Sequence, residues 1–183
     1  GAGGGGVKSG GWARGGVGAG RGAAAAVGRG GCGASGRAKI KRAVTAAPVT
    51  RGVVRRFVAG DTVEDALRVT RELTADGLLV SLDHLGEDTL DATAATAAVG
   101  AYRLLAHRLS EEGLGGRSEM SVKLSAVGQA LDESMALDNA RLICEAARDA
   151  GTSVTVDMED HTTTDSTLRL VGLLRQDFPS TGA

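Results

Sequence analysis

Residues 120–158 read MSVKLSAVGQALDESMALDNARLICEAARDAGTSVTVDM, and this stretch decides the fold class. It begins with a short apolar run, 120–124, that has the length of a buried strand. An amphipathic helix is predicted over 134–150, where Gly151 ends it, and residues 153–158 alternate like a second strand. A strand, a helix and a strand in this order indicate two parallel strands joined by a right-handed crossover.

The same alternation of strands and helices continues in both directions along the chain. Upstream, the apolar run 78–82 (LLVSL) predicts another strand, and an Ala-rich helix is expected over 90–112. Downstream, a helix is expected over 166–177, and a further helix capped by Asp61 or Thr62 precedes the first strand. The pattern therefore predicts three βα units with one helix in front.

Polar residues that follow the strands favour a barrel over an open doubly wound sheet. Catalytic groups of a (βα)8 barrel gather where its strands end, and here those positions hold Asp83, His84, Lys123, Ser125, Asp157, Glu159, Asp160 and His161. A doubly wound nucleotide site would instead have a Gly-rich turn after its first strand, and residues 83–86 (DHLG) lack that fingerprint. We therefore expect an α/β fold that forms the N-terminal part of a (βα)8 TIM-type barrel.

A complete barrel needs about 250 residues, so three units cannot close one. We expect residues 39–183 to form an incomplete barrel domain, with a fourth strand due just after Ala183. In that case the third strand is left as an open edge.

Residues 1–38 differ from the rest of the chain, because 17 of them are Gly and most of the others are Ala or Arg. Such a segment buries too little apolar surface to offset the entropy lost on ordering, so we expect a disordered tail. Charge separates the two parts as well. Residues 1–60 carry eleven basic and no acidic side chains, and residues 61–183 carry a net charge of −12. Nucleic-acid binding through this basic tail is one alternative function. No nucleic-acid partner is expected, however, because the chain has only four aromatic residues for base stacking.

Other classes are excluded by what the sequence lacks. The sequence contains no run of about 18 apolar residues, so no membrane-spanning helix is predicted. Cys32 and Cys144 lie far apart in unlike contexts, which indicates neither a zinc knuckle nor a disulfide framework and fits a reducing compartment.

Two charged residues at strand ends are the main candidates for chemistry. Lys123 lies in a strand-like run, where a cation either clamps a substrate carboxylate, acts as an amine of shifted pKa, or extends to solvent. Asp157 follows the alternating Val154 and Val156, and it either forms part of an active-site floor or anchors the next loop. On adjacent strands, Lys123 and Asp157 would be ion-paired neighbours.

A metal-dependent TIM-barrel hydrolase that uses His84, Asp157 and His161 is a second alternative. Against it, the chain contains neither His-x-His nor His-x-x-x-His. Residues 160–166 also have the composition of a loop that caps the next helix. We therefore expect no metal site.

Three motifs in order, LLVSLDHLGED, MSVKLSAVGQALD and VTVDMEDHTTTDSTL, closely resemble the proline dehydrogenase family in its bacterial monofunctional form. The resemblance covers residues 39–183. It implies a (βα)8 barrel that binds FAD, oxidises L-proline to Δ1-pyrroline-5-carboxylate in proline catabolism, and passes electrons to a membrane quinone. It also implies a cytoplasmic protein with peripheral contact to the inner face of the membrane.

The resemblance assigns roles to individual residues. Lys123 resembles the lysine that binds the proline carboxylate, Asp157 the catalytic aspartate, and Met158 a residue that contacts the flavin. Glu87 resembles a glutamate that gates the substrate pocket. The family also has a flavin-contacting Gln on the fourth strand and a pair of Arg on the last helix, and neither is present here. We therefore expect this stretch alone to be inactive.

Overall fold

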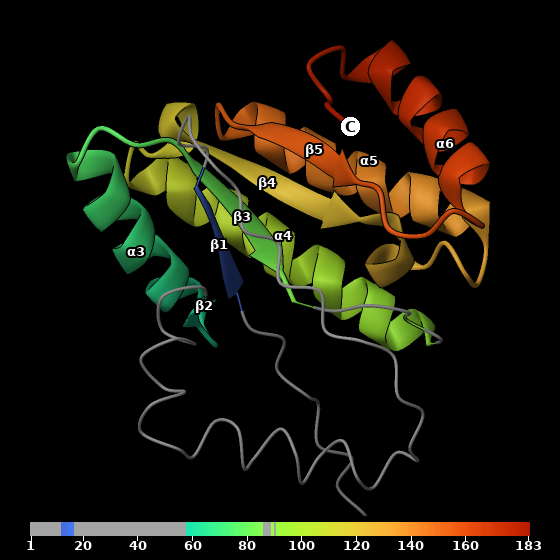
Figure 1. Cartoon of the computed structure of the whole chain (residues 1–183), viewed down its shortest axis with the longest axis horizontal. Coiled ribbons are helices and arrows are strands. Elements are labelled where there is room, and N and C mark those ends of the chain that lie inside the picture. Colours follow the sequence, from blue (N-terminus) through green and yellow to red (C-terminus); the bar gives the residue numbers. More distant parts are fainter. Residues whose placement is uncertain (1–11, 17–57, 86–88, 90) are drawn as a thin grey trace, which may run out of the picture.

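The computed structural model describes residues 12–16, 58–85, 89 and 91–183, and its centre is a parallel sheet. Strands β3 (Val80–His84), β4 (Ser118–Lys123) and β5 (Ser153–Asp157) lie side by side and run in the same direction. Each is followed by a helix, namely α4 (Ala92–Glu111), α5 (Glu133–Asp149) and α6 (Thr164–Asp177), and α3 (Val63–Ala75) precedes β3 (Figure 1). The three βα units expected from the sequence are confirmed.

Two antiparallel strands extend the sheet beyond β3. β1 (Trp12–Gly16) pairs with both β3 and β2 (Val58–Gly60), which gives the strand order β2-β1-β3-β4-β5. The five residues of β1 belong to the segment expected to be a disordered tail, and that expectation does not hold for them, because the backbone of β3 pairs with them. Residues 1–11 and 17–57, which include the rest of that segment, lie outside the described residues.

Three glycines end the helices in the same way. Gly77, Gly113 and Gly151 all adopt positive φ angles of 68° to 82°, directly after α3, α4 and α5. In each case the amide two residues beyond the last helical turn bonds back to it, as when Leu78 N donates to Leu73 O at 3.0 Å. This is the Schellman motif, which needs a left-handed residue and therefore selects glycine.

The two faces of the parallel sheet differ in chemistry, because successive side chains of a strand point to opposite faces. One face carries Val80, Leu82, Met120, Val122, Val154 and Val156, all at most 4% exposed. In register on the other face lie Ser81, Asp83, Glu119, Ser121, Lys123, Ser153, Thr155 and Asp157. The sheet therefore has one fully apolar face and one fully polar face between Val80 and Asp157.

The helices α3, α4 and α5 pack on the apolar face, and α6 packs beside α5. Their buried side chains, among them Leu67, Leu105, Ile143 and Leu174, join the apolar strand residues in a single cluster. Figure 1 shows α4 and α5 side by side behind the parallel strands. Across the described part of the chain, every helix is too short or too polar to traverse a lipid bilayer.

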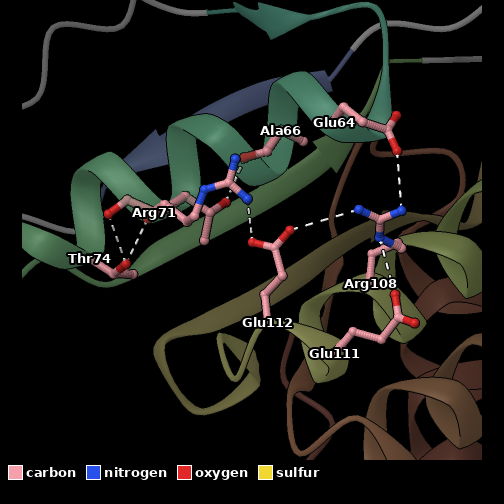
Figure 2. Close-up of polar contacts among 8 residues, drawn as sticks. Glu64, Ala66, Arg71, Thr74, Arg108, Glu111 and Glu112 are labelled. Atoms are coloured by element: carbon pink, nitrogen blue, oxygen red, sulfur yellow. Dashed lines mark hydrogen bonds and ion pairs between the residues drawn. The ribbon is translucent and has the colours of Figure 1, made fainter.

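Ion pairs connect the solvent sides of α3 and α4 (Figure 2). Arg71 of α3 pairs with Glu112 at the end of α4, and Glu64 of α3 lies 3.5 Å from the guanidinium of Arg108 on α4. Arg108 also lies 3.9 Å from Glu112, so the four side chains form one chain of alternating charge. Because most of these groups face solvent, each pair contributes little to the free energy of unfolding.

The edge of β5 is partly covered. Gly182 forms a parallel bridge with Thr155, because its amide donates to Val154 O at 2.9 Å and its carbonyl accepts from Val156 N at 3.0 Å. The sequence had predicted an open edge at the third strand, with the next strand starting after Ala183. That expectation is corrected at this point, because residues 178–181 turn the chain back onto β5 before its last residue.

Candidate active site

Three charged residues lie together where the parallel strands end. Lys123 and Asp157 are in register on β4 and β5, and Asp83 on β3 is on the same polar face. The ammonium Nζ of Lys123 lies 3.1 Å from Asp83 Oδ2, and both side chains are 18% exposed. Lys123 and Asp157 therefore lie on neighbouring strands as the sequence predicted, but the ion pair described for Lys123 is with Asp83 and not the predicted one with Asp157.

The surroundings of Asp83 act in opposite directions on its pKa. Burial is the largest influence and raises the pKa, the ammonium of Lys123 opposes this, and the negative charge of Asp157 raises it again. The net direction is upward. Lys123 thus opposes the neutralisation of Asp83 that burial favours.

Tyr102 of α4 reaches the same region from the helical side of the sheet. Its hydroxyl accepts a hydrogen bond from His84 N at 3.1 Å and donates to the carbonyl of Ser121 at 2.6 Å. The same oxygen lies 3.4 Å from Asp83 Oδ1. The hydroxyl therefore lies between β3 and β4 just after their last register pair, Asp83 and Ser121. Burial, and next the charge of Asp83, raise the pKa of Tyr102, so the phenol keeps its proton.

Replacing Tyr102 with Phe should lower the free energy of unfolding by about 1–3 kcal/mol, because two buried backbone groups lose their partner. Tyr102 is 1% exposed, so water does not readily replace the hydroxyl. Urea denaturation of Tyr102→Phe beside Thr96→Ala, which removes an exposed hydroxyl from the same helix, measures the difference. Equal midpoints for the two variants would show that the tyrosine hydroxyl contributes no stability here.

The loops that follow the strands are tied to one another. Thr89, after β3, donates from its amide to Ser125 O at 3.2 Å and from its hydroxyl to Ala126 O at 3.1 Å. Glu159, after β5, accepts from Ser125 N at 3.3 Å. Ser125 and Ala126 belong to the short helix η2 (Leu124–Val127), which directly follows β4. The loop after β4 is thus held from both sides, which fixes the end of the strand that carries Lys123.

The remaining candidates from the sequence lie around this cluster. Met158 follows β5 directly and is 46% exposed, and His161 lies farther along the same loop. Glu87 lies outside the described residues. Within the described residues, no three His, Cys, Asp or Glu side chains are arranged to hold a metal ion. The set His84, Asp157 and His161 of the metal-hydrolase alternative is therefore not assembled as a metal site.

The sequence profile of the proline dehydrogenase family matches residues 66–181, which contain all of these side chains. The chain belongs to the proline dehydrogenase family. Proline dehydrogenase 1 of Bacillus subtilis (strain 168) is 35% identical over 133 residues, which are 73% of this chain and 43% of that protein. Proline dehydrogenase of Deinococcus radiodurans is 36% identical over 126 residues, 67% of this chain and 40% of the relative. This proline dehydrogenase chain thus spans about two fifths of the length of the curated relatives it matches.

A solved structure supports the fold of this proline dehydrogenase chain. The crystal structure of proline utilization A (PutA) from Bdellovibrio bacteriovorus, inactivated by N-propargylglycine, superposes with a TM-score of 0.62 over 70% of this chain and 16% of that one. At 20% identity, this likeness concerns the arrangement of the strands and helices alone.

Two members of the cluster were missed or only partly recognised from the sequence. Asp83 was noted as a strand-end residue, but its pairing with Lys123 was not predicted. Tyr102 was not considered at all, although a tyrosine in an Ala-rich helix, and the only one in the chain, is a usable signal. A buried tyrosine usually bonds through its hydroxyl, so its partner is worth seeking.

Proposed function

We propose that the full-length protein containing this chain oxidises L-proline to Δ1-pyrroline-5-carboxylate, with FAD as cofactor and a membrane quinone as electron acceptor. The observation that carries the proposal is the register of Lys123 with Asp157 at the ends of neighbouring parallel strands, within a chain of this family. The chain covers two fifths of its relatives, so the activity is proposed for the full-length gene product, and the 183 residues alone are expected to be inactive.

The charges of the cluster suit a zwitterionic amino acid. Neighbouring strands are about 4.8 Å apart, so a cation and an anion in register are close enough for one small zwitterion to contact both. Proline carries its carboxylate and its secondary ammonium on the same carbon. In the proposal, Lys123 binds the carboxylate and Asp157, the catalytic residue, accepts a hydrogen bond from the ammonium. Both contacts orient the ring, so that hydride leaves the other carbon bonded to nitrogen, on the side away from the carboxylate, while the ammonium releases one proton to solvent and its electron pair forms the C=N bond.

A flavin fits the side chains that are present beside this cluster. Met158 adjoins Asp157 and leaves almost half of its surface exposed, and its flexible, polarisable side chain suits contact with a flat aromatic ring. When bound, FAD supplies the two-electron acceptor for the hydride. In the proposal, this chain holds proline by its two charges.

We also propose that β3, β4 and β5 are consecutive strands of a (βα)8 barrel. Support comes from the helices packed on one face, the polar rows on the other, and the parallel bridge of Gly182 to β5. In a doubly wound sheet both faces would be apolar and covered by helices. The proposal places the polar face, and hence Lys123 and Asp157, inside the barrel. Access to a quinone would need only peripheral contact of a cytoplasmic protein with the membrane.

The proposal is tested by purifying the full-length gene product and recording its visible spectrum before and after adding L-proline without oxygen. The expected result is the absorption of an oxidised flavin that bleaches with L-proline and returns when a soluble quinone is added. The 183-residue chain, prepared in parallel, is expected to show no flavin absorption. A folded full-length protein that lacks flavin, or whose flavin does not respond to proline, contradicts the proposal.

A further inference from the structure

A lysine that recognises a carboxylate must itself be held in place. The side chain of Lys123 has four rotatable bonds, and its compact charge does not define one direction of approach. Asp83 supplies such a constraint, because its Oδ2 lies 3.1 Å from Nζ and neither side chain is more than 18% exposed. The pair is shielded from water, so its attraction is stronger than that of a surface pair.

Asp83 is itself held by its surroundings. It lies in β3, in register with Ser121 of β4, so its backbone is fixed by the sheet. On the side away from Lys123, its Oδ1 lies 3.4 Å from the hydroxyl of Tyr102, which also bonds to the backbone of β3 and β4. The carboxylate is therefore held by the strand backbone, with Tyr102 against one oxygen and Lys123 bonded to the other, and it can hold the ammonium in turn.

We propose that Asp83 is a positioning residue, which keeps the Lys123 ammonium charged and directed toward the substrate carboxylate. This inference rests on the proposed function, because it names the substrate as proline. Asp83 touches Lys123 and not the reacting atoms, so its removal should weaken binding more than turnover. The mechanism is electrostatic. Without Asp83, a mostly buried lysine loses an adjacent anion, and the pKa of its ammonium falls.

Other titratable groups around the cluster influence how the pH dependence of activity changes when Asp83 is removed. Within the described residues, the titratable side chains on the neighbouring elements are Asp83 and His84 of β3, Tyr102 of α4, Asp157 of β5 and Glu159 in the loop after β5. Burial lowers the pKa of His84 and raises that of Tyr102, so neither titrates in the weakly alkaline range. A change there on removing Asp83 is therefore attributable to Lys123.

The test compares three variants of the full-length protein. Asp83→Asn keeps the shape and removes the charge, and Asp83→Glu keeps the charge. Glu119→Gln removes another carboxylate from the same polar face, at the far end of β4, where it bonds to Thr155 and not to Lys123. Two quantities are measured, namely the pKa of Lys123 by 15N NMR of its ammonium, assigned with Lys123→Arg, and the steady-state kinetics with L-proline.

Asp83→Asn should lower the pKa of Lys123 by at least about one unit and raise KM for L-proline by about tenfold. Turnover at saturation should change little, and the alkaline limb of kcat/KM should move to lower pH by the same amount as the pKa. In Asp83→Glu, the pKa of Lys123 and the KM for L-proline should return most of the way to the wild-type values. Glu119→Gln should leave both quantities unchanged. If Asp83→Asn does not fold, Asp83→Ser takes its place in every comparison.

An unchanged Lys123 pKa in Asp83→Asn overturns the inference, and so does an equal fall in Glu119→Gln, which would indicate a general effect of net charge. A loss of kcat with KM unchanged overturns it as well. Failure of the proposed function is a separate result. If the wild-type protein does not oxidise proline, the activity is refuted, and the pKa of Lys123 in the variants still decides whether Asp83 holds the ammonium.

Discussion

Lys123→Met in the full-length protein should raise KM for L-proline by about two orders of magnitude. The ammonium is the cation of the polar face next to Asp157, and methionine retains the length of the side chain without the charge. Removing one partner of a desolvated charge pair costs about 2–5 kcal/mol, and each 1.4 kcal/mol corresponds to a factor of ten in affinity. The fold should survive, because Asp83, whose pKa burial already raises, takes up a proton when its partner is lost.

A substrate analogue distinguishes loss of carboxylate recognition from general damage. L-prolinamide has the ring and the amine of proline but no negative charge, so it can form only a hydrogen bond and no ion pair with the ammonium of Lys123. As a competing ligand, it should bind Lys123→Met about as well as it binds the wild-type protein. Equal losses of affinity for proline and for prolinamide would show that Lys123 has a structural role and does not bind the carboxylate.

The elements of this fold could be predicted because local chemistry determines them. Gly151 was expected to end its helix, and it does so with the positive φ angle that the cap requires, as Gly77 and Gly113 do after α3 and α4. The strand boundaries were less accurate, and the reason is physical. The first strand was expected over 78–82 and is observed over Val80–His84, because the amide of Leu78 is used in the helix cap. An apolar run shows that a strand is near but does not show where pairing begins.

The candidate site could be predicted only in part, for a related reason. Strand order and register place Lys123 beside Asp157, and both follow from the βα pattern. The choice of Asp83 as partner depends on which way a flexible lysine side chain turns between two flanking strands. The contact of Tyr102 depends on how α4 packs across the sheet, eighteen residues after His84. Both contacts depend on tertiary packing, so no local sequence pattern predicts them.

Gly115→Ala should lower the free energy of unfolding by about 3 kcal/mol, since the added methyl group has no space. A Cβ at this position would lie 2.1 Å from the carbonyl oxygen of Ala150, which belongs to the backbone at the end of α5 and cannot rotate away. Gly115 lies in the short helix η1 (Gly115–Arg117), which leads directly into β4. Relief of the clash therefore requires β4 to move relative to α5 and β5.

Gly116→Ala is the matched control. Its Cβ would meet nothing within 4 Å, and its φ is not in the left-handed region, so the unfolding free energy should stay within about 0.5 kcal/mol of wild type. Denaturant unfolding of both variants measures the difference, and equal midpoints would show that this close approach is not maintained in solution. Because β4 carries Lys123 at its other end, Gly115→Ala should also weaken proline binding. Weaker proline binding by Gly115→Ala would show that the close packing of η1 against the end of α5 helps to keep Lys123 in register with Asp157.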